Sequence, residues 1–313
     1  MASGKGDIRA HDSSAHKLEF VGAGGVWQIA VLDWACRDVM QIERIAAFAL
    51  EGRGGNPAGV VIGDALPSHA EMQRVAREVG YSETAFAARE GDLWQVRYFA
   101  PESEVPFCGH ATIALGCALG QRFGEGRYDL QTSQARISVE AALIDAGWQA
   151  VLTSPPTWSK PMPPALQAEL LRQFGLTEAD LDAILSPHLA HAGATHAVLA
   201  LHNRATLAAM HYGFETMLAL MQREGLTSIS LIYREDADTF VARNAFAVGG
   251  VVEDPATGAA AAALGGLLVD LGRSAGSFTI RQGEDMGAPS LLHVTVTGQK
   301  GAGVRVGGST RLL

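Results

Sequence analysis

The sequence has little positive charge and few cysteines, and each shortage argues against a class of function. It contains 24 Lys and Arg residues against 33 Asp and Glu residues, which gives a formal net charge of -9. Nucleic acids and anionic membranes are bound through clustered cationic side chains, so we expect neither as a partner. The three cysteines, Cys36, Cys108 and Cys117, show no CxxC spacing, which argues against a disulfide framework and against a zinc cluster. A reducing cytoplasm is the predicted location.

Long apolar runs are also missing. No stretch of about 18 apolar residues occurs, and the start "MASGKGDIRAHDSSAHKLEF" lacks the pattern of an export signal. A chain of 313 residues is long enough for two domains. We predict an N-terminal extension over 1–38, partly disordered, a first domain over 39–153 and a second over 154–313, whose final strands are candidates for crossing back to the first.

The hydrophobic pattern predicts an alternation of strands with a few helices. Ser68 is the predicted N-cap of a helix. The five prolines within 154–164 favour a linker or a sheet edge. Helices are predicted over 69–80, 111–123, 165–175, 177–185 and the small-residue segment after Thr257. Strands are predicted over 42–50, 60–66, 83–90, 94–100, 128–132, 136–140, 148–153, 196–201, 228–235 and 239–248, and in three runs near the C-terminus.

The second half of the chain repeats a pattern of the first. Ala111-Thr112 is followed by Leu119-Gly120, and Ala256-Thr257 is followed at the same interval by Leu264-Gly265, an offset of 145. Both segments predict a helix of small residues that is apolar all round and therefore buried on every side. The pattern predicts an α+β fold of two pseudo-symmetric halves, each a curled, mostly antiparallel sheet around a central helix.

The start of each central helix is a candidate anion site. The first N–H groups of a helix are unpaired, and the positive end of its dipole points outward. Gly109 and Gly258 permit close backbone approach, and Thr112 and Thr257 could add hydroxyl donors. If the two helix starts face each other, they could hold a carboxylate substrate between them. The alternative is that both are well-capped core helices without a ligand.

Three side chains near these helix starts are candidates for proton transfer. His110 and Asp254 precede or begin the helices, and Glu83 lies at the edge of an otherwise apolar strand. Burial would raise the pKa of Glu83 toward a useful value, whereas a solvated Glu at a strand edge would have no such role.

Cys108 is a candidate for three roles: a metal ligand, a nucleophile or base, and a small structural residue. Cys117 lies seven residues beyond His110, deep in the predicted helix, so we expect no metal. The repeat matches Cys108 with Glu253 or Asp254 rather than with a second cysteine, which favours the structural role. No Walker or dinucleotide motif occurs, and we expect no cofactor.

Five motifs in order resemble those of the phenazine-biosynthesis PhzF-like isomerase family, a branch of the diaminopimelate epimerase and proline racemase superfamily. They are "GGNPAGVV", "YSETAF", "VRYFAPESEVPFCGHATIALG", "EDPATGAAAAALGGLL" and "IRQGEDMGAPS". The resemblance covers about Met40 to the C-terminus. One departure is "AFAVGGVVEDP", where family members usually have a proline shortly after Phe-Ala.

The resemblance implies the epimerase-type fold, with the active site between the halves, and a cofactor-free isomerisation of 2,3-dihydro-3-hydroxyanthranilate or a related small carboxylate. It implies Glu83 as the acid and base, with His110 and Asp254 shaping the site. A homodimer is common in that family. The predicted substrate-binding residues are Asn56, Ser82, Gly109, Thr112, Thr257, Gly258 and Ala259.

Two other functions are compatible with the sequence. A racemase or epimerase of a carboxylate would need two thiols at the cleft, and a non-catalytic binding protein would keep the fold without turnover. Retention of Glu83, His110 and Asp254 favours the isomerase.

Overall fold

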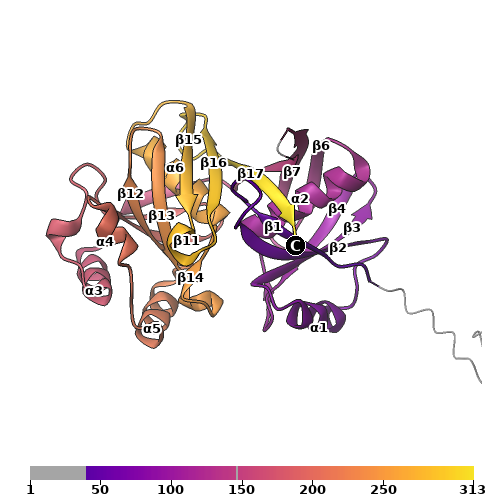
Figure 1. Cartoon of the computed structure of the whole chain (residues 1–313), viewed down its shortest axis with the longest axis horizontal. Coiled ribbons are helices and arrows are strands. Elements are labelled where there is room, and N and C mark those ends of the chain that lie inside the picture. The colour runs from indigo at the N-terminus through magenta and orange to yellow at the C-terminus, as the bar shows by residue number, and fades with distance from the viewer. Residues whose placement is uncertain (1–39, 146) are drawn as a thin grey trace, which may run out of the picture. The chain divides into compact units, whose positions relative to one another are not determined.

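Two helices of small residues, α2 (Gly109–Phe123) and α6 (Gly258–Asp270), each lie against the inner face of a curled sheet (Figure 1). The computed structural model describes residues 40–145 and 147–313, and the extension predicted over 1–38 lies outside them. Every residue of α2 from 109 to 120 is buried, because this helix has no polar face to expose. The predicted α+β fold with a central helix in each half is confirmed.

The sheet around α2 closes on itself. Its pairing order is β1-β2-β3-β4-β6-β7-β8-β17 and back to β1, and only β2–β3 and β4–β6 are parallel. Closure leaves this ring without an unpaired edge. The strands are β1 (Glu43–Ala47), β2 (Asn56–Gly63), β3 (Glu83–Glu90), β4 (Leu93–Phe99), β6 (Gly126–Gln131), β7 (Arg136–Ile144), β8 (Gly147–Thr153) and β17 (Arg305–Leu312).

The sheet around α6 repeats this order without closing. Its pairing order is β9-β10-β11-β12-β13-β15-β16-β17, with β11–β12 and β13–β15 parallel. The short strands β5 (Glu104–Val105) and β14 (Glu253–Asp254) precede the two central helices. The others are β9 (Trp158–Pro161), β10 (His188–His191), β11 (Thr195–Leu201), β12 (Ser228–Arg234), β13 (Thr239–Ala245), β15 (Gly276–Gln282) and β16 (Ser290–Val296).

β17 belongs to both sheets. It pairs with β16 of the second half and with β8 and β1 of the first half. In Figure 1 this strand runs from the sheet around α6 to the sheet around α2. The C-terminal strand therefore ties the halves together through backbone hydrogen bonds.

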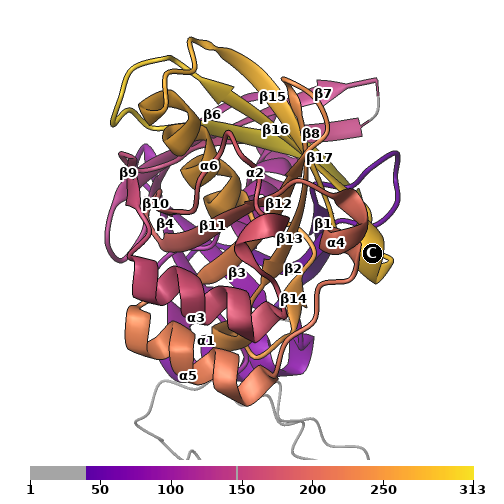
Figure 2. The same cartoon turned by 90° about the vertical axis from the view of Figure 1, so that its left-hand side faces the viewer.

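The remaining helices cover outer faces of the sheets. Helices α3 and α5 lie side by side in Figure 2, and their apolar residues form a second core with β11, β12 and β13. This core is separate from the one around α2 and α6. The outer helices are α1 (His69–Val79), α3 (Pro164–Phe174), α4 (Arg204–Ala208) and α5 (Phe214–Glu224). No helix within 40–145 and 147–313 is long and apolar enough to cross a membrane.

Glycines let the sheets approach the central helices. A Cβ at Gly116 of α2 would lie 2.5 Å from a methyl group of Val139, and one at Gly265 of α6 would lie 2.8 Å from a methyl group of Val304. Both distances are too short for carbon atoms in contact. The two positions are equivalent in the two halves and differ by 149 in number.

The repeat therefore has an offset of 149 at the central helices, not the 145 predicted from the sequence. The strands β4 and β13 correspond to each other at an offset of 146. Phe99 of β4 pairs with β5 in the same way as Ala245 of β13 pairs with β14. The connection from β13 to α6 is three residues longer and contains the 3₁₀ turn η2 (Ala247–Gly249). The predicted offset differs from the structural one by four residues, which is about one helical turn. The sequence therefore aligned residues that lie on the same face of the two helices.

Several predicted elements differ in extent. β2 begins at Asn56 rather than at residue 60. The segment predicted as a helix over 177–185 contains only a 3₁₀ turn, η1 (Glu178–Asp180). A capping box between Thr177 and Asp180 starts the helical turn. The turn ends at Leu181, because Leu181 pairs with Leu201. α4, α5 and β10 were not predicted, and η3 (Glu284–Met286) follows β15.

The two halves contain equivalent ion pairs that differ in burial. Arg243 donates to Glu253 with Nε at 3.0 Å, and the two side chains are 11% and 5% exposed. Arg97 pairs with Glu104 in the same register, with 31% and 23% exposure. We predict that Arg243→Met lowers the free energy of unfolding by about 3–5 kcal/mol, because it leaves Glu253 buried without a partner.

The matched variant Arg97→Met should cost about 1 kcal/mol or less, because solvent screens the partly exposed Glu104. Denaturant unfolding of both variants measures the difference. Equal losses for the two would contradict this account.

Candidate active site

The N-termini of α2 and α6 face each other at van der Waals distance. A Cβ placed on Gly109 would lie 3.3 Å from the backbone nitrogen of Ala259 and 3.4 Å from Cα of Gly258. A Cβ on Gly258 would lie 3.6 Å from Cα of Gly109 and 3.2 Å from the ring of Phe48. The two helix starts therefore face each other, which meets the condition for a shared anion site, and their N–H groups come from both halves of the chain.

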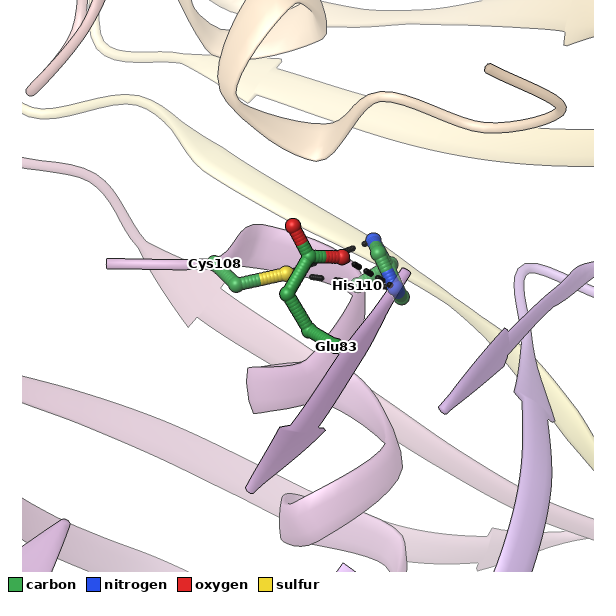
Figure 3. A group of neighbouring side chains, drawn as sticks. All are labelled: Glu83, Cys108 and His110. Carbon is green, nitrogen blue, oxygen red and sulfur yellow. Dashed lines mark hydrogen bonds and ion pairs between the residues drawn. The ribbon is translucent and has the colours of Figure 1, made fainter. Parts of the chain in front are cut away.

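Four side chains of the first half gather at the start of α2, and Figure 3 shows three of them, Glu83, Cys108 and His110. Glu83, the first residue of β3, brings Oε2 to 3.3 Å from Nε2 of His110. Ser82 Oγ lies 3.3 Å from the same nitrogen, and Cys108 Sγ lies 3.4 Å from Nδ1 of the ring. The predicted residues Ser82, Glu83 and His110 are thus brought together. Cys108, predicted to be structural, lies among them.

One carboxylate oxygen of Glu83 is buried and receives no hydrogen bond from the described residues. The Glu83 side chain is 10% exposed, and its Oε2 atom is buried without a hydrogen-bond partner among the described residues. The contact with His110 is at ion-pair distance but lacks hydrogen-bond geometry. A buried carboxylate oxygen without a donor costs free energy, so a bound ligand that supplies a proton or a donor would be stabilised there.

Asp254 lies at the start of the second helix and is held from both halves. Asn56, the first residue of β2, donates from Nδ2 to Asp254 Oδ1 at 2.7 Å and to the Ala256 carbonyl at 2.9 Å. Thr257 donates from Oγ1 to Asp254 Oδ2 at 2.5 Å. Asn56 therefore links a strand of the first half to the loop that presents Asp254. The structure gives Asn56 this positioning contact.

The environment of Asp254 raises its pKa to about 6. Burial is the main cause, and the nearby charge of Glu83 adds to it. The charge of His110 and the hydrogen bonds from Thr257 and Asn56 oppose the shift by favouring the ionised form. Asp254 thus titrates close to neutral pH.

Gln282 completes the support of Asp254 and was missed in the sequence. Its Nε2 donates to the Asp254 carbonyl at 2.7 Å and to Thr257 Oγ1 at 3.1 Å, and its Oε1 accepts from the Thr257 N–H at 3.2 Å. It is 2% exposed. A polar residue at an inward-facing position of the alternating strand β15 was the available signal, but only the fold shows that β15 ends beside α6.

Thr112 does not serve as the predicted substrate donor. Its hydroxyl donates to the Cys108 carbonyl at 2.6 Å and lies 2.6 Å from the hydroxyl of Tyr98, and the residue is fully buried. A hydroxyl has one proton to donate, and here the helix backbone accepts it. Thr112 therefore fixes the first turn of α2.

The Cys108 position has a different counterpart from the one predicted. At the structural offset of 149, Cys108 corresponds to Thr257 rather than to Glu253 or Asp254, and His110 corresponds to Ala259. The second helix start therefore has no second thiol. Burial and the charge of Glu83 raise the pKa of the Cys108 thiol well above its ordinary value, so it is protonated at neutral pH.

The donors at the first helix start also form a cluster. One ligand atom each of Glu83, Cys108 and His110 lies within 4.8 Å of the others, and all three residues are buried. Cys117, the further ligand that the sequence offered, lies in the core around α2. Glu83 is distant from Cys108 and His110 in sequence and becomes their neighbour only in the fold.

Comparison with known proteins finds a matching family and relatives. The family described as phenazine biosynthesis-like protein matches residues 45–312. An uncharacterized isomerase of Deinococcus radiodurans is 32% identical over 276 residues, 84% of this chain and 90% of the relative. The trans-2,3-dihydro-3-hydroxyanthranilate isomerase of Pseudomonas fluorescens is 31% identical over 270 residues, 82% of this chain and 90% of the relative.

Solved structures share the fold at lower identity. The PhzF-family phenazine biosynthesis protein of Bacillus anthracis has a TM-score of 0.77 at 23% identity, covering 88% of this chain and 97% of that one. A probable proline racemase of Agrobacterium radiobacter has a TM-score of 0.62 at 14% identity, covering 88% and 91%. With a family match over nearly all described residues and relatives above 30% identity, the chain belongs to the phenazine-biosynthesis PhzF-like isomerase family.

Proposed function

We propose that this protein is a cofactor-independent isomerase that moves a proton between two carbons of a small unsaturated amino- or hydroxy-carboxylate. The observation that carries the proposal is the buried Glu83 carboxylate. Its Oε2 has no hydrogen-bond partner in the described part of the chain, and it lies beside the start of α2, which faces the start of α6. A base in this position can take a proton from a ligand held between the helices.

The helix starts would hold the substrate carboxylate. The N–H groups of Gly109, Gly258 and Ala259 belong to the first turns of α2 and α6, where backbone donors are free and the helix dipoles favour an anion. Because these donors come from both helices, the substrate would be fixed relative to both halves.

Glu83 would act first as a base and then as an acid. As a carboxylate it takes a proton from a carbon beside the unsaturated system, and the electron pair of the C–H bond is delocalised into that system. The proton then returns from Glu83 to a different carbon. Atoms and charge balance without any oxidation, so the chemistry needs no redox partner.

His110 and Asp254 would orient the amino or hydroxyl group. Asp254, held by Asn56 and Thr257, can accept a hydrogen bond from a substrate N–H or O–H. His110 lies 3.3 Å from Glu83 and close enough to Asp254 for its charge to influence that carboxylate. This proximity fits a substrate that spans only a few atoms.

The first substrate to test is trans-2,3-dihydro-3-hydroxyanthranilate, after the name of the relatives in Pseudomonas. It has the carboxylate, the amino group, the hydroxyl group and the unsaturation that the proposed site requires. Other relatives are named only as isomerases, so a panel of small unsaturated amino- and hydroxy-acids belongs in the same experiment.

We predict that Glu83→Gln abolishes the transfer of solvent deuterium into the substrate. General acid–base catalysis contributes about 10²–10⁴-fold to a rate, and the amide cannot accept the proton. Mass spectrometry of the panel in deuterated buffer measures the exchange. Glu90→Gln is the matched control, because Glu90 is the exposed last residue of the same strand. Exchange that persists in Glu83→Gln at the native rate would place the base elsewhere.

A second prediction concerns Asp254 and pH. Since folding raises its pKa from 3.8 to about 6, the folded state binds this proton more tightly than the unfolded state. The resulting stability is complete below about pH 4 and is lost as the pH rises through 6, a change of about 3 kcal/mol. As the pH rises from 4 to 7, we expect the free energy of unfolding of the native protein to fall by this amount compared with that of Asp254→Asn.

Denaturant unfolding between pH 4 and pH 7 measures the effect. Asp64→Asn, at an exposed position, is the control and should run parallel to the native protein. Native and Asp254→Asn curves that stay parallel over this range would show that Asp254 has an ordinary pKa.

A further inference from the structure

The cluster of Glu83, Cys108 and His110 matches the donor set of a thiophilic divalent cation. The three residues supply a carboxylate oxygen, a sulfur and an imidazole nitrogen, the three ligand types that zinc binds in proteins. Among the described residues, Glu83 Oε2 is buried without a hydrogen-bond partner, and it points toward the ring of His110 (Figure 3). An open carboxylate oxygen beside a sulfur and a nitrogen is a feature that a cation would satisfy.

The spacing of the donors also fits. With bond lengths of about 2.0–2.1 Å to nitrogen and oxygen and about 2.3 Å to sulfur, tetrahedral ligands stand about 3.3 Å (N to O) and about 3.6 Å (N to S) apart. Here His110 Nε2 lies 3.3 Å from Glu83 Oε2 and 3.9 Å from Cys108 Sγ. The third pair, Glu83 and Cys108, lies within 4.8 Å, so the side chains would have to move closer together to coordinate one ion.

The charges favour a soft divalent cation over Mg²⁺ or Ca²⁺. A thiolate and a carboxylate supply two negative charges, and a sulfur ligand is poorly suited to cations that prefer oxygen. The positive end of the α2 dipole opposes a cation, but its strength is about half a charge. If Asp254 bound the metal directly, it would lose hydrogen bonds, because its two oxygens accept them from Asn56 and Thr257.

We propose that Glu83, Cys108 and His110 bind one Zn²⁺, or a similar thiophilic cation, with a fourth position left for water. On binding, the Cys108 S–H bond breaks, sulfur coordinates the metal and the proton passes to solvent. The metal would occupy Oε2 of Glu83 and thereby inhibit the isomerase. The binding itself is independent of the proposed function, whereas the inhibition rests on it.

Cobalt absorption provides the direct test. The experiment uses the full chain, treated with chelator, in a Cys36→Ser background that removes the thiol outside the described residues. We expect one Co²⁺ per chain and a near-ultraviolet sulfur-to-cobalt charge-transfer band. The band should be lost in Cys108→Ser and kept in Cys117→Ala, the matched control with the other thiol of α2.

Calorimetric titration with Zn²⁺ tests the other ligands. Glu83→Gln and His110→Gln should each weaken binding at least tenfold, while circular dichroism confirms that each variant is folded. If Cys108→Ser does not fold, these two variants, which keep the thiol, decide the question. A charge-transfer band that survives in Cys108→Ser, no stoichiometric band in the native protein, or unchanged Zn²⁺ affinity in Glu83→Gln would overturn the proposal.

Isotope exchange separates this proposal from the proposed function. Exchange that stops with one equivalent of Zn²⁺ and returns with chelator supports both. Exchange without stoichiometric Zn²⁺ binding removes the metal site and leaves the isomerase. Zn²⁺ binding without exchange by any substrate keeps the metal site and removes the isomerase.

Discussion

The close contact between the starts of α2 and α6 is the constraint on which the rest of the structure depends. Gly109 and Gly258 lie so close that a Cβ on either would touch the backbone of the other helix, so two helix starts from different halves can act on one small ligand. Contact at this distance requires both helices to be buried in their sheets, which explains their small residues. It also requires the halves to be held in register, which β17 and the Asn56–Asp254 hydrogen bond provide.

The fold is repeated, but its chemistry is not. By strand register Glu83 corresponds to Ser228, which bonds to His196 at 2.8 Å, and burial lowers the pKa of that histidine to about 3. The second half thus has a neutral pair where the first half has its carboxylate. Thr257 stands where a second thiol would be needed for racemisation by two cysteines. The acid–base groups lie in the first half, and the second half contributes Asp254.

The sequence was sufficient for features that depend on local pattern. The limits of β3, the Ser68 cap of α1 and the burial of α2 follow from alternation, capping and an apolar helix surface. The sequence was insufficient for features that depend on contacts between segments far apart in the chain. The three-residue insertion before α6 disguised the true repeat, and Thr112 looked like a ligand donor until Tyr98 was placed beside it. Gln282 became informative only when β15 was known to end near Asp254.

The two carboxylates of the site cannot be considered independently. Glu83 raises the pKa of Asp254, and His110 lowers it, so the ionisation of Asp254 near pH 6 depends on both residues. As the pH rises through that value, Asp254 gains a negative charge. A substrate amino or hydroxyl group that donates to Asp254 would offset this charge, while its carboxylate lies at the helix starts. Binding and ionisation are thereby coupled, and the arrangement favours substrates that carry a donor and an anion a few atoms apart.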